Sequence, residues 1–137
     1  MAVRKIEVYN DSMEVAEGAA RHILTASRNS ITRRGSFHLV LSGGETPRTL
    51  YEVLSRSPFN QLIEWRKVQV YWGDERCVPP DDAGSNYALA REVLLSRVPI
   101  PPENIHRVEA ETGGEQAARK YEATLRKFFD GEIPRFD

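Results

Sequence analysis

Residues 37–51 constrain the fold more than any other part of the sequence, because a short apolar run leads through a Gly-Gly turn into an amphipathic helix. The run at residues 37–41 (FHLVL) is nearly continuous, which is typical of a strand covered on both faces. Thr46 and Pro47 suit the N-cap and first position of the helix that follows, and its apolar stripe is Leu50, Tyr51 and Leu54. This order of strand, turn and helix predicts an α/β fold with a largely parallel sheet.

The rest of the chain continues the alternation of short apolar runs and longer amphipathic stretches. The expected elements are strand 5–9 (KIEVY), a helix capped by Asn10, Asp11 or Ser12 and running to about Asn29, strand 37–41, a helix from Pro47 to the Ser57-Pro58 break, strand 68–72 (VQVYW), a helix capped by Ser85, a short strand at 105–108, and a last helix that follows Gly113-Gly114 and ends at Gly131. We predict that residues 1–137 form a single domain, a three-layer Rossmann-like sandwich with a mainly parallel sheet.

Composition and charge narrow the functional class. A chain of 137 residues with 40% hydrophobic and 28% charged residues fits one globular domain. Its 19 basic and 20 acidic residues give a net charge of -1, which argues against a nucleic-acid or anionic-membrane binder. The single cysteine, Cys77, excludes a disulfide framework and a multi-cysteine zinc site, and we expect it to be a small buried residue. No apolar run is long enough to span a membrane and the N-terminus does not resemble a secretory signal, so the expected location is the cytoplasm.

The Gly-Gly turn between strand and helix is a candidate phosphate site. Glycines leave the backbone N–H groups open to a ligand, and the helix that follows presents unpaired donors and a partial positive charge. The hydroxyls of Ser42 and Thr46 add to Gly43 and Gly44 in such a cradle. The sequence is neither GxxxxGK[ST] nor GxGxxG, and an ordinary strand-to-helix turn accounts equally well for the glycines taken alone.

A second candidate, Gly73-Asp74-Glu75-Arg76, follows the strand at 68–72. Ligands of open α/β sheets bind beyond the carboxyl ends of the strands, where the Gly-Gly turn also lies. Asp74 and Glu75 suit a base or an orienting carboxylate, and Arg76 suits an anion clamp, although a solvated turn with paired charges is the alternative. Ser85 and Asn86 form a third candidate, with a helix cap as the alternative. His22, His38 and His106 do not stand with a nucleophile in a catalytic pattern.

Three motifs in order give a resemblance to a known family. LSGGETP, VYWGDERCVPPDDAGSN and PENIHRVEAE together resemble the 6-phosphogluconolactonase family of the oxidative pentose phosphate pathway. The resemblance implies hydrolysis of 6-phospho-D-glucono-1,5-lactone by water, with no metal or cofactor. It places the 6-phosphate on Ser42, Gly43, Gly44 and Thr46. Asp74 and Arg76 would act at the sugar ring, and the loop around it would be shaped by Gly73, Ser85 and Asn86.

The resemblance also shows a departure. The family's general base is a histidine in a motif like Gly-x-Asp-Gly-His-Thr-Ala-Ser, which does not occur in these residues. We therefore expect the chain to be the N-terminal half of such an enzyme, truncated at its C-terminus, weakly active or inactive, and prone to self-association through exposed strand edges. The alternatives are a hexosamine-phosphate isomerase or deaminase that uses Asp74 for proton transfer, and a sugar-phosphate-binding module without chemistry. Arg76 and residues 79–86 favour the lactonase branch.

Overall fold

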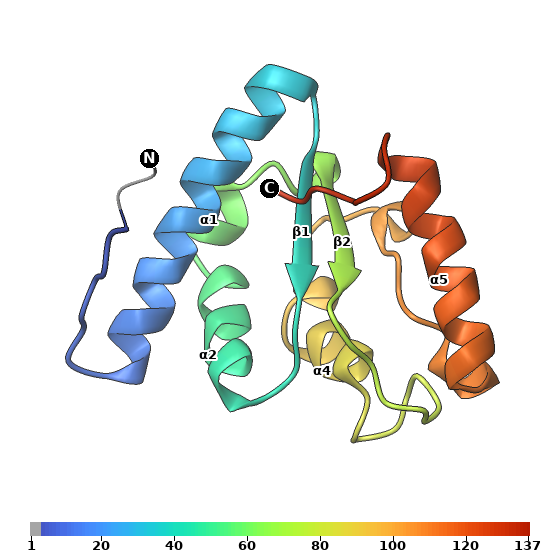
Figure 1. Cartoon of the computed structure of the whole chain (residues 1–137). Coiled ribbons are helices and arrows are strands. Elements are labelled where there is room, and N and C mark those ends of the chain that lie inside the picture. Colours follow the sequence, from blue (N-terminus) through green and yellow to red (C-terminus); the bar gives the residue numbers. More distant parts are fainter. Residues whose placement is uncertain (1–3) are drawn as a thin grey trace.

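A computed structural model describes residues 4–137 of the chain (Figure 1). The elements in order are α1 (Ser12–Arg34), β1 (Phe37–Leu41), α2 (Glu45–Leu54), α3 (Phe59–Leu62), η1 (Trp65–Lys67), β2 (Val68–Trp72), α4 (Asn86–Val93), η2 (Leu95–Arg97), η3 (Pro102–Asn104), η4 (Ala110–Thr112) and α5 (Gly114–Phe128). Both predicted central strands have the expected bounds.

The sheet is parallel. In the described part of the chain it consists of β1 and β2, with Phe37 opposite Val68 and Leu41 opposite Trp72. The short strand expected at residues 105–108 is reduced to one parallel bridge between Val70 and Ile105. Because the two strands are parallel neighbours, the loops that follow them emerge side by side at the carboxyl end of the sheet (Figure 1).

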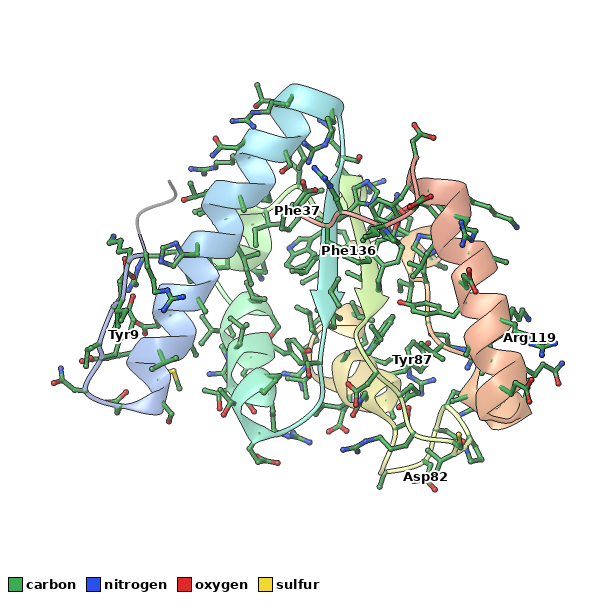
Figure 2. The ribbon with its side chains drawn as sticks, in the orientation of Figure 1. Tyr9, Phe37, Asp82, Tyr87, Arg119 and Phe136 are labelled. Carbon is green, nitrogen blue, oxygen red and sulfur yellow. The ribbon has the colours of Figure 1, made fainter. Side chains whose placement is uncertain are left out.

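The two faces of the sheet are covered differently. On one face, the buried side chains of Phe37, Leu41, Val68, Val70 and Trp72 join the core formed with α1, α2 and α4. On the other face lies an aromatic cluster of His38, Tyr71, His106, Phe128, Phe129 and Phe136 (Phe136 is labelled in Figure 2). Helices on one face and the end of α5 on the other confirm the three-layer α/β arrangement.

The outer edge of β1 meets the end of the described chain. The Asp137 backbone N–H donates to the His38 carbonyl oxygen (3.1 Å), and the Asp137 carboxylate accepts from the His38 N–H (2.8 Å). The same carboxylate pairs with Arg34 at the end of α1. These contacts cover the first part of the edge, and self-association through it stays a prediction.

The strand predicted at residues 5–9 is wrong. This segment is extended but pairs with no strand among the described residues, and its apolar side chains Ile6 and Val8 are 79% and 89% exposed. It contacts α1 through the Tyr9 ring, which lies against Gly18, and through Glu7, which accepts from the Tyr9 hydroxyl (2.7 Å) and lies 3.0 Å from His22 Nε2. Apolar and polar residues therefore alternate in this segment although no neighbouring strand in the described part of the chain buries the apolar ones.

Several helix ends also differ from prediction. α1 begins at Ser12 with Asp11 as N-cap, as expected, but runs past Asn29 to Arg34 because Gly35 (φ 80°) provides a left-handed C-cap. α2 begins at Glu45, one residue before the expected Thr46 cap, because Gly44 (φ 109°) takes the N-cap position. α5 ends at Phe128 rather than at Gly131.

The two histidines of the aromatic cluster predict a dependence of stability on pH. Burial lowers the pKa of both His38 and His106, with Arg34 adding to the effect on His38 and His38 adding to that on His106. The folded state thus prefers the neutral rings. Stability is full above the unfolded pKa of about 6.5 and is lost as the pH falls through the folded values.

We expect the free energy of unfolding, measured by urea denaturation, to fall between pH 7.5 and pH 5.5. In the His38→Gln/His106→Gln double variant the fall should be smaller, because both titrating rings are gone. The variant and the wild type share all other groups, so the comparison isolates these two histidines. Equal slopes in the two proteins would contradict the prediction.

Candidate functional site

Two loops at the carboxyl ends of the parallel strands form the candidate site. Residues 42–44 follow β1, and are called the Gly-Gly loop below; residues 73–76 follow β2, and are called the acidic loop. The Gly73 N–H donates to the Leu41 carbonyl oxygen (3.0 Å), which continues the strand ladder by one bond. The structure therefore brings the two predicted candidates together.

Asn86, the first residue of α4, connects the loops. Its side chain is buried, and its Nδ2 donates to the Asp74 carbonyl oxygen (3.1 Å) and to Asp74 Oδ1 (3.2 Å). A Cβ atom added at Gly43 would overlap the Asn86 carboxamide oxygen. Gly43 is therefore needed for space, whereas Gly44 is needed for its positive φ.

Glu75 holds the acidic loop against α4. Its carboxylate accepts four hydrogen bonds, from the N–H groups of Asn86 (2.7 Å), Arg76 (2.8 Å) and Tyr87 (3.0 Å) and from the Ser85 hydroxyl (2.9 Å). Burial would raise the pKa of this carboxyl, but the hydrogen bonds outweigh it and the pKa lies below its ordinary value. Of the two roles suggested by the sequence, the geometry fits the orienting carboxylate, because Glu75 is fully engaged as an acceptor.

Ser85 and Asn86 are both buried and engaged within the protein. Ser85 is the N-cap of α4, as expected, with its Oγ accepting from the Ala88 N–H (3.1 Å). Ser42, Thr46, Gly73 and Asp74 are exposed. The arrangement therefore offers the Gly-Gly loop and Asp74 to a ligand, and uses Ser85 and Asn86 to shape them.

Arg76 faces a cavity that Gly44 of the Gly-Gly loop also lines. Its Nη1 donates to the Gly84 carbonyl oxygen (3.0 Å), and its side chain lines this cavity of about 470 Å³ between α2, α4 and the loop at residues 81–84. Asp82 lies in this loop, beyond β2, as Figure 2 shows. Glu45 and Arg48 line the same cavity.

Arg48 was missed as a candidate, although its position in the first turn of a helix opened by Gly-Gly was a usable signal. Arg48 and Arg76 each supply a guanidinium group beside the Gly-Gly loop, while Glu45 supplies a negative charge there.

The remaining chemistry-bearing residues lie elsewhere. His38 Nδ1 is 3.0 Å from the Tyr71 hydroxyl, His106 Nε2 is 2.7 Å from Gln69 Oε1, and both rings belong to the aromatic cluster. Cys77 is exposed, so its predicted burial is wrong: it lies in an open loop after the acidic loop. Within residues 4–137, no group of three or more His, Cys, Asp or Glu side chains is arranged to hold a metal ion. No helix in the described residues combines the length and apolar character needed to cross a membrane.

Comparison with known proteins gives the family. A family model described as glucosamine-6-phosphate isomerases/6-phosphogluconolactonase matches residues 10–137. The chain belongs to this family. The resemblance drawn from the three sequence motifs is thereby confirmed.

Individual relatives in the family agree in name. A 6-phosphogluconolactonase from Nostoc is 40% identical over 98% of this chain, and one from Synechocystis is 39% identical over 97%. The chain covers 56% and 55% of these proteins, so it spans about half the length of the relatives it matches.

Solved structures show the same fold. The crystal structure of a devB protein has a TM-score of 0.86 and 34% identity, covering 96% of this chain and 54% of that one. The 6-phosphogluconolactonase of Thermotoga maritima has a TM-score of 0.80 and 32% identity, covering 94% of this chain and 55% of that one. A monomeric glucosamine-6-phosphate deaminase has a TM-score of 0.75 at 19% identity, which shows a shared fold alone.

Proposed function

We propose that this chain forms the phosphate-binding part of a 6-phosphogluconolactonase, which hydrolyses 6-phospho-D-glucono-1,5-lactone to 6-phosphogluconate in the oxidative pentose phosphate pathway. The observation that carries the proposal is the placement of Asn86, which joins Asp74 to Gly43 and so makes one site of two loops. The names of relatives from Nostoc and Synechocystis support the same activity. The proposal also includes a cytoplasmic location. Relatives from rice are named chloroplastic, so the location differs from that named for those proteins.

The phosphate end of the substrate would lie on the Gly-Gly loop. α2 begins directly after Gly44 and has ten residues, so its first N–H groups and its dipole favour an anion there. The exposed hydroxyls of Ser42 and Thr46 flank this helix end. Arg48, one turn into the helix, adds a positive charge nearby.

The lactone end would lie over the acidic loop. Water adds to the C1 carbonyl carbon, the bond from C1 to the ring oxygen breaks, and that oxygen takes a proton to become the C5 hydroxyl. The new carboxyl group releases a proton and becomes an anion. Arg76 can pair with this anion, while Asp74, held by Asn86, can accept a hydrogen bond from the sugar.

Binding of the product tests the site in this chain. We expect 6-phosphogluconate to bind by isothermal titration calorimetry, and Arg76→Lys to weaken it roughly tenfold or more, because a bidentate guanidinium is lost. Arg91→Gln is a matched control, since Arg91 is exposed on α4 and does not line the cavity. An equal loss of affinity in the two variants would show that Arg76 does not contact the ligand.

Three turnover outcomes separate the candidate functions. Lactone hydrolysis supports the lactonase. Ammonia release from glucosamine 6-phosphate in its place would establish the deaminase alternative. Binding without either reaction, in this chain and in any longer form of the protein, would establish the sugar-phosphate-binding module.

A further inference from the structure

Two tyrosine hydroxyls make the same unusual contact at opposite edges of the sheet. The Tyr51 hydroxyl accepts from the Ser42 N–H (2.9 Å) and donates to the Ser42 carbonyl oxygen (2.5 Å). The Tyr121 hydroxyl accepts from the Trp72 N–H (2.8 Å) and donates to the Trp72 carbonyl oxygen (2.9 Å). Each hydroxyl thus satisfies both backbone groups of one residue.

The strand geometry explains where these residues point. Successive residues in a strand direct their N–H and C=O groups to opposite sides. Leu41 and Gly73 bond to each other between β1 and β2, so Ser42 and Trp72 direct their groups away from the shared side. A neighbouring strand would normally bond there, and the two hydroxyls take its place. Figure 1 shows α2, which carries Tyr51, beside β1, and α5, which carries Tyr121, beside β2.

Both hydroxyls are able to do this at neutral pH. A hydroxyl that donates to a carbonyl oxygen must keep its proton, and burial raises the pKa of both phenols above the ordinary value. The Tyr51 side chain is 2% exposed, so water cannot easily replace its oxygen. Removing either oxygen would leave an N–H donor and a C=O acceptor without partners.

The two contacts lie where the loops of the candidate site begin. Ser42 is the first residue of the Gly-Gly loop, and Trp72 precedes Gly73 and Asp74. We infer that Tyr51 and Tyr121 are positioning residues: Tyr51 fixes the loop that binds phosphate, and Tyr121 fixes the loop that binds the sugar ring. This inference rests on the proposed function, since it assigns one end of the same ligand to each tyrosine.

The assignment predicts a split between two probes, inorganic phosphate and 6-phosphogluconate. Tyr51→Phe should weaken the binding of both by about tenfold, the cost of leaving backbone groups unpaired in the loop that holds phosphate. Tyr121→Phe should weaken 6-phosphogluconate by a similar factor and leave inorganic phosphate unchanged. Each variant loses one oxygen and keeps its ring, so the fold is retained, and a urea titration verifies this.

Tyr9→Phe is the matched control, because its hydroxyl bonds the exposed Glu7 side chain and lies outside the site. Faster amide exchange at Ser42 in Tyr51→Phe and at Trp72 in Tyr121→Phe should accompany the affinity changes. If the wild type binds and the two variants match Tyr9→Phe in affinity, or if both variants weaken both probes alike, the inference fails. A wild type that binds neither probe would instead refute the proposed function.

Discussion

Replacing Gly43 with alanine is expected to abolish binding of 6-phosphogluconate and to lower the free energy of unfolding by about 1–3 kcal/mol, the range for overpacking a filled site. The added methyl group would overlap the Asn86 carboxamide. Asn86 can move away only by giving up both hydrogen bonds to Asp74. One methyl group in the Gly-Gly loop thus displaces the carboxylate of the neighbouring loop. Calorimetric titration and urea denaturation measure the two effects.

A double-mutant cycle separates this cause from other effects of alanine. If the overlap with Asn86 is responsible, Gly43→Ala should cost almost no stability in an Asn86→Ala background. Gly114→Ala is the control: an added Cβ there lies 3.7 Å from Cys77 Sγ, an ordinary contact, and α5 gains a better helix former. Additive effects of Gly43→Ala and Asn86→Ala would show that the two residues do not constrain each other.

The sequence predicted the central strands and missed the edges of the fold for one physical reason. Residues 37–41 and 68–72 are buried against helices, so their apolar content reflects their surroundings directly. Residues 5–9 show a strand pattern of equal quality, but pairing depends on a partner strand that the local pattern does not reveal. The start of α2 was misplaced because a glycine with φ 109° at Gly44 displaced the better-known Thr-Pro signal.

The position of the candidate site was predictable from the sequence, but the roles of its individual residues were not. The sequence placed both loops at the carboxyl ends of parallel strands, and the structure shows that β1 and β2 are neighbours, which brings the loops together. The roles of Glu75 and Asn86 depend on contacts across about ten residues of irregular loop, which no local pattern encodes. Tyr51 was expected only as part of an apolar stripe, and its hydroxyl contact with Ser42 becomes visible only once α2 is placed beside β1.

Glu75→Ala is expected to produce the largest loss of stability among the site variants, about 2–4 kcal/mol. Four donors lose one carboxylate acceptor, and a hydrogen bond to a charged group contributes roughly 1.5–3 kcal/mol, partly replaced by water here. Two of the donors are N–H groups in the first turn of α4, so the variant also removes a negative charge from a helix N-terminus. Urea denaturation at pH 7 measures the loss, and Glu103→Ala, on an exposed turn, should stay within about 0.5 kcal/mol of the wild type.

The pH dependence identifies the carboxylate as the source of this stability. The folded pKa of Glu75 lies below the ordinary value near 4.5, so its contribution is full above that pH and is lost as the pH falls through the folded value. The stability gap between the wild type and Glu75→Gln should therefore be widest at neutral pH and should narrow below pH 4.5. A gap that stays constant on acidification would mean that the side chain acts through its shape rather than its charge.

Loss of the Glu75 carboxylate should also change the position of the Gly-Gly loop. The effect is indirect and passes through Asn86. Glu75 accepts from the Asn86 N–H, and the Asn86 side chain holds Asp74 while lying against Gly43. Freeing the start of α4 therefore loosens the group that sets the distance between the two loops. We expect Glu75→Gln to weaken 6-phosphogluconate while the protein stays folded. In a Gly43→Ala background the same variant should lower the free energy of unfolding by less than it does in the wild type, because both changes act through Asn86.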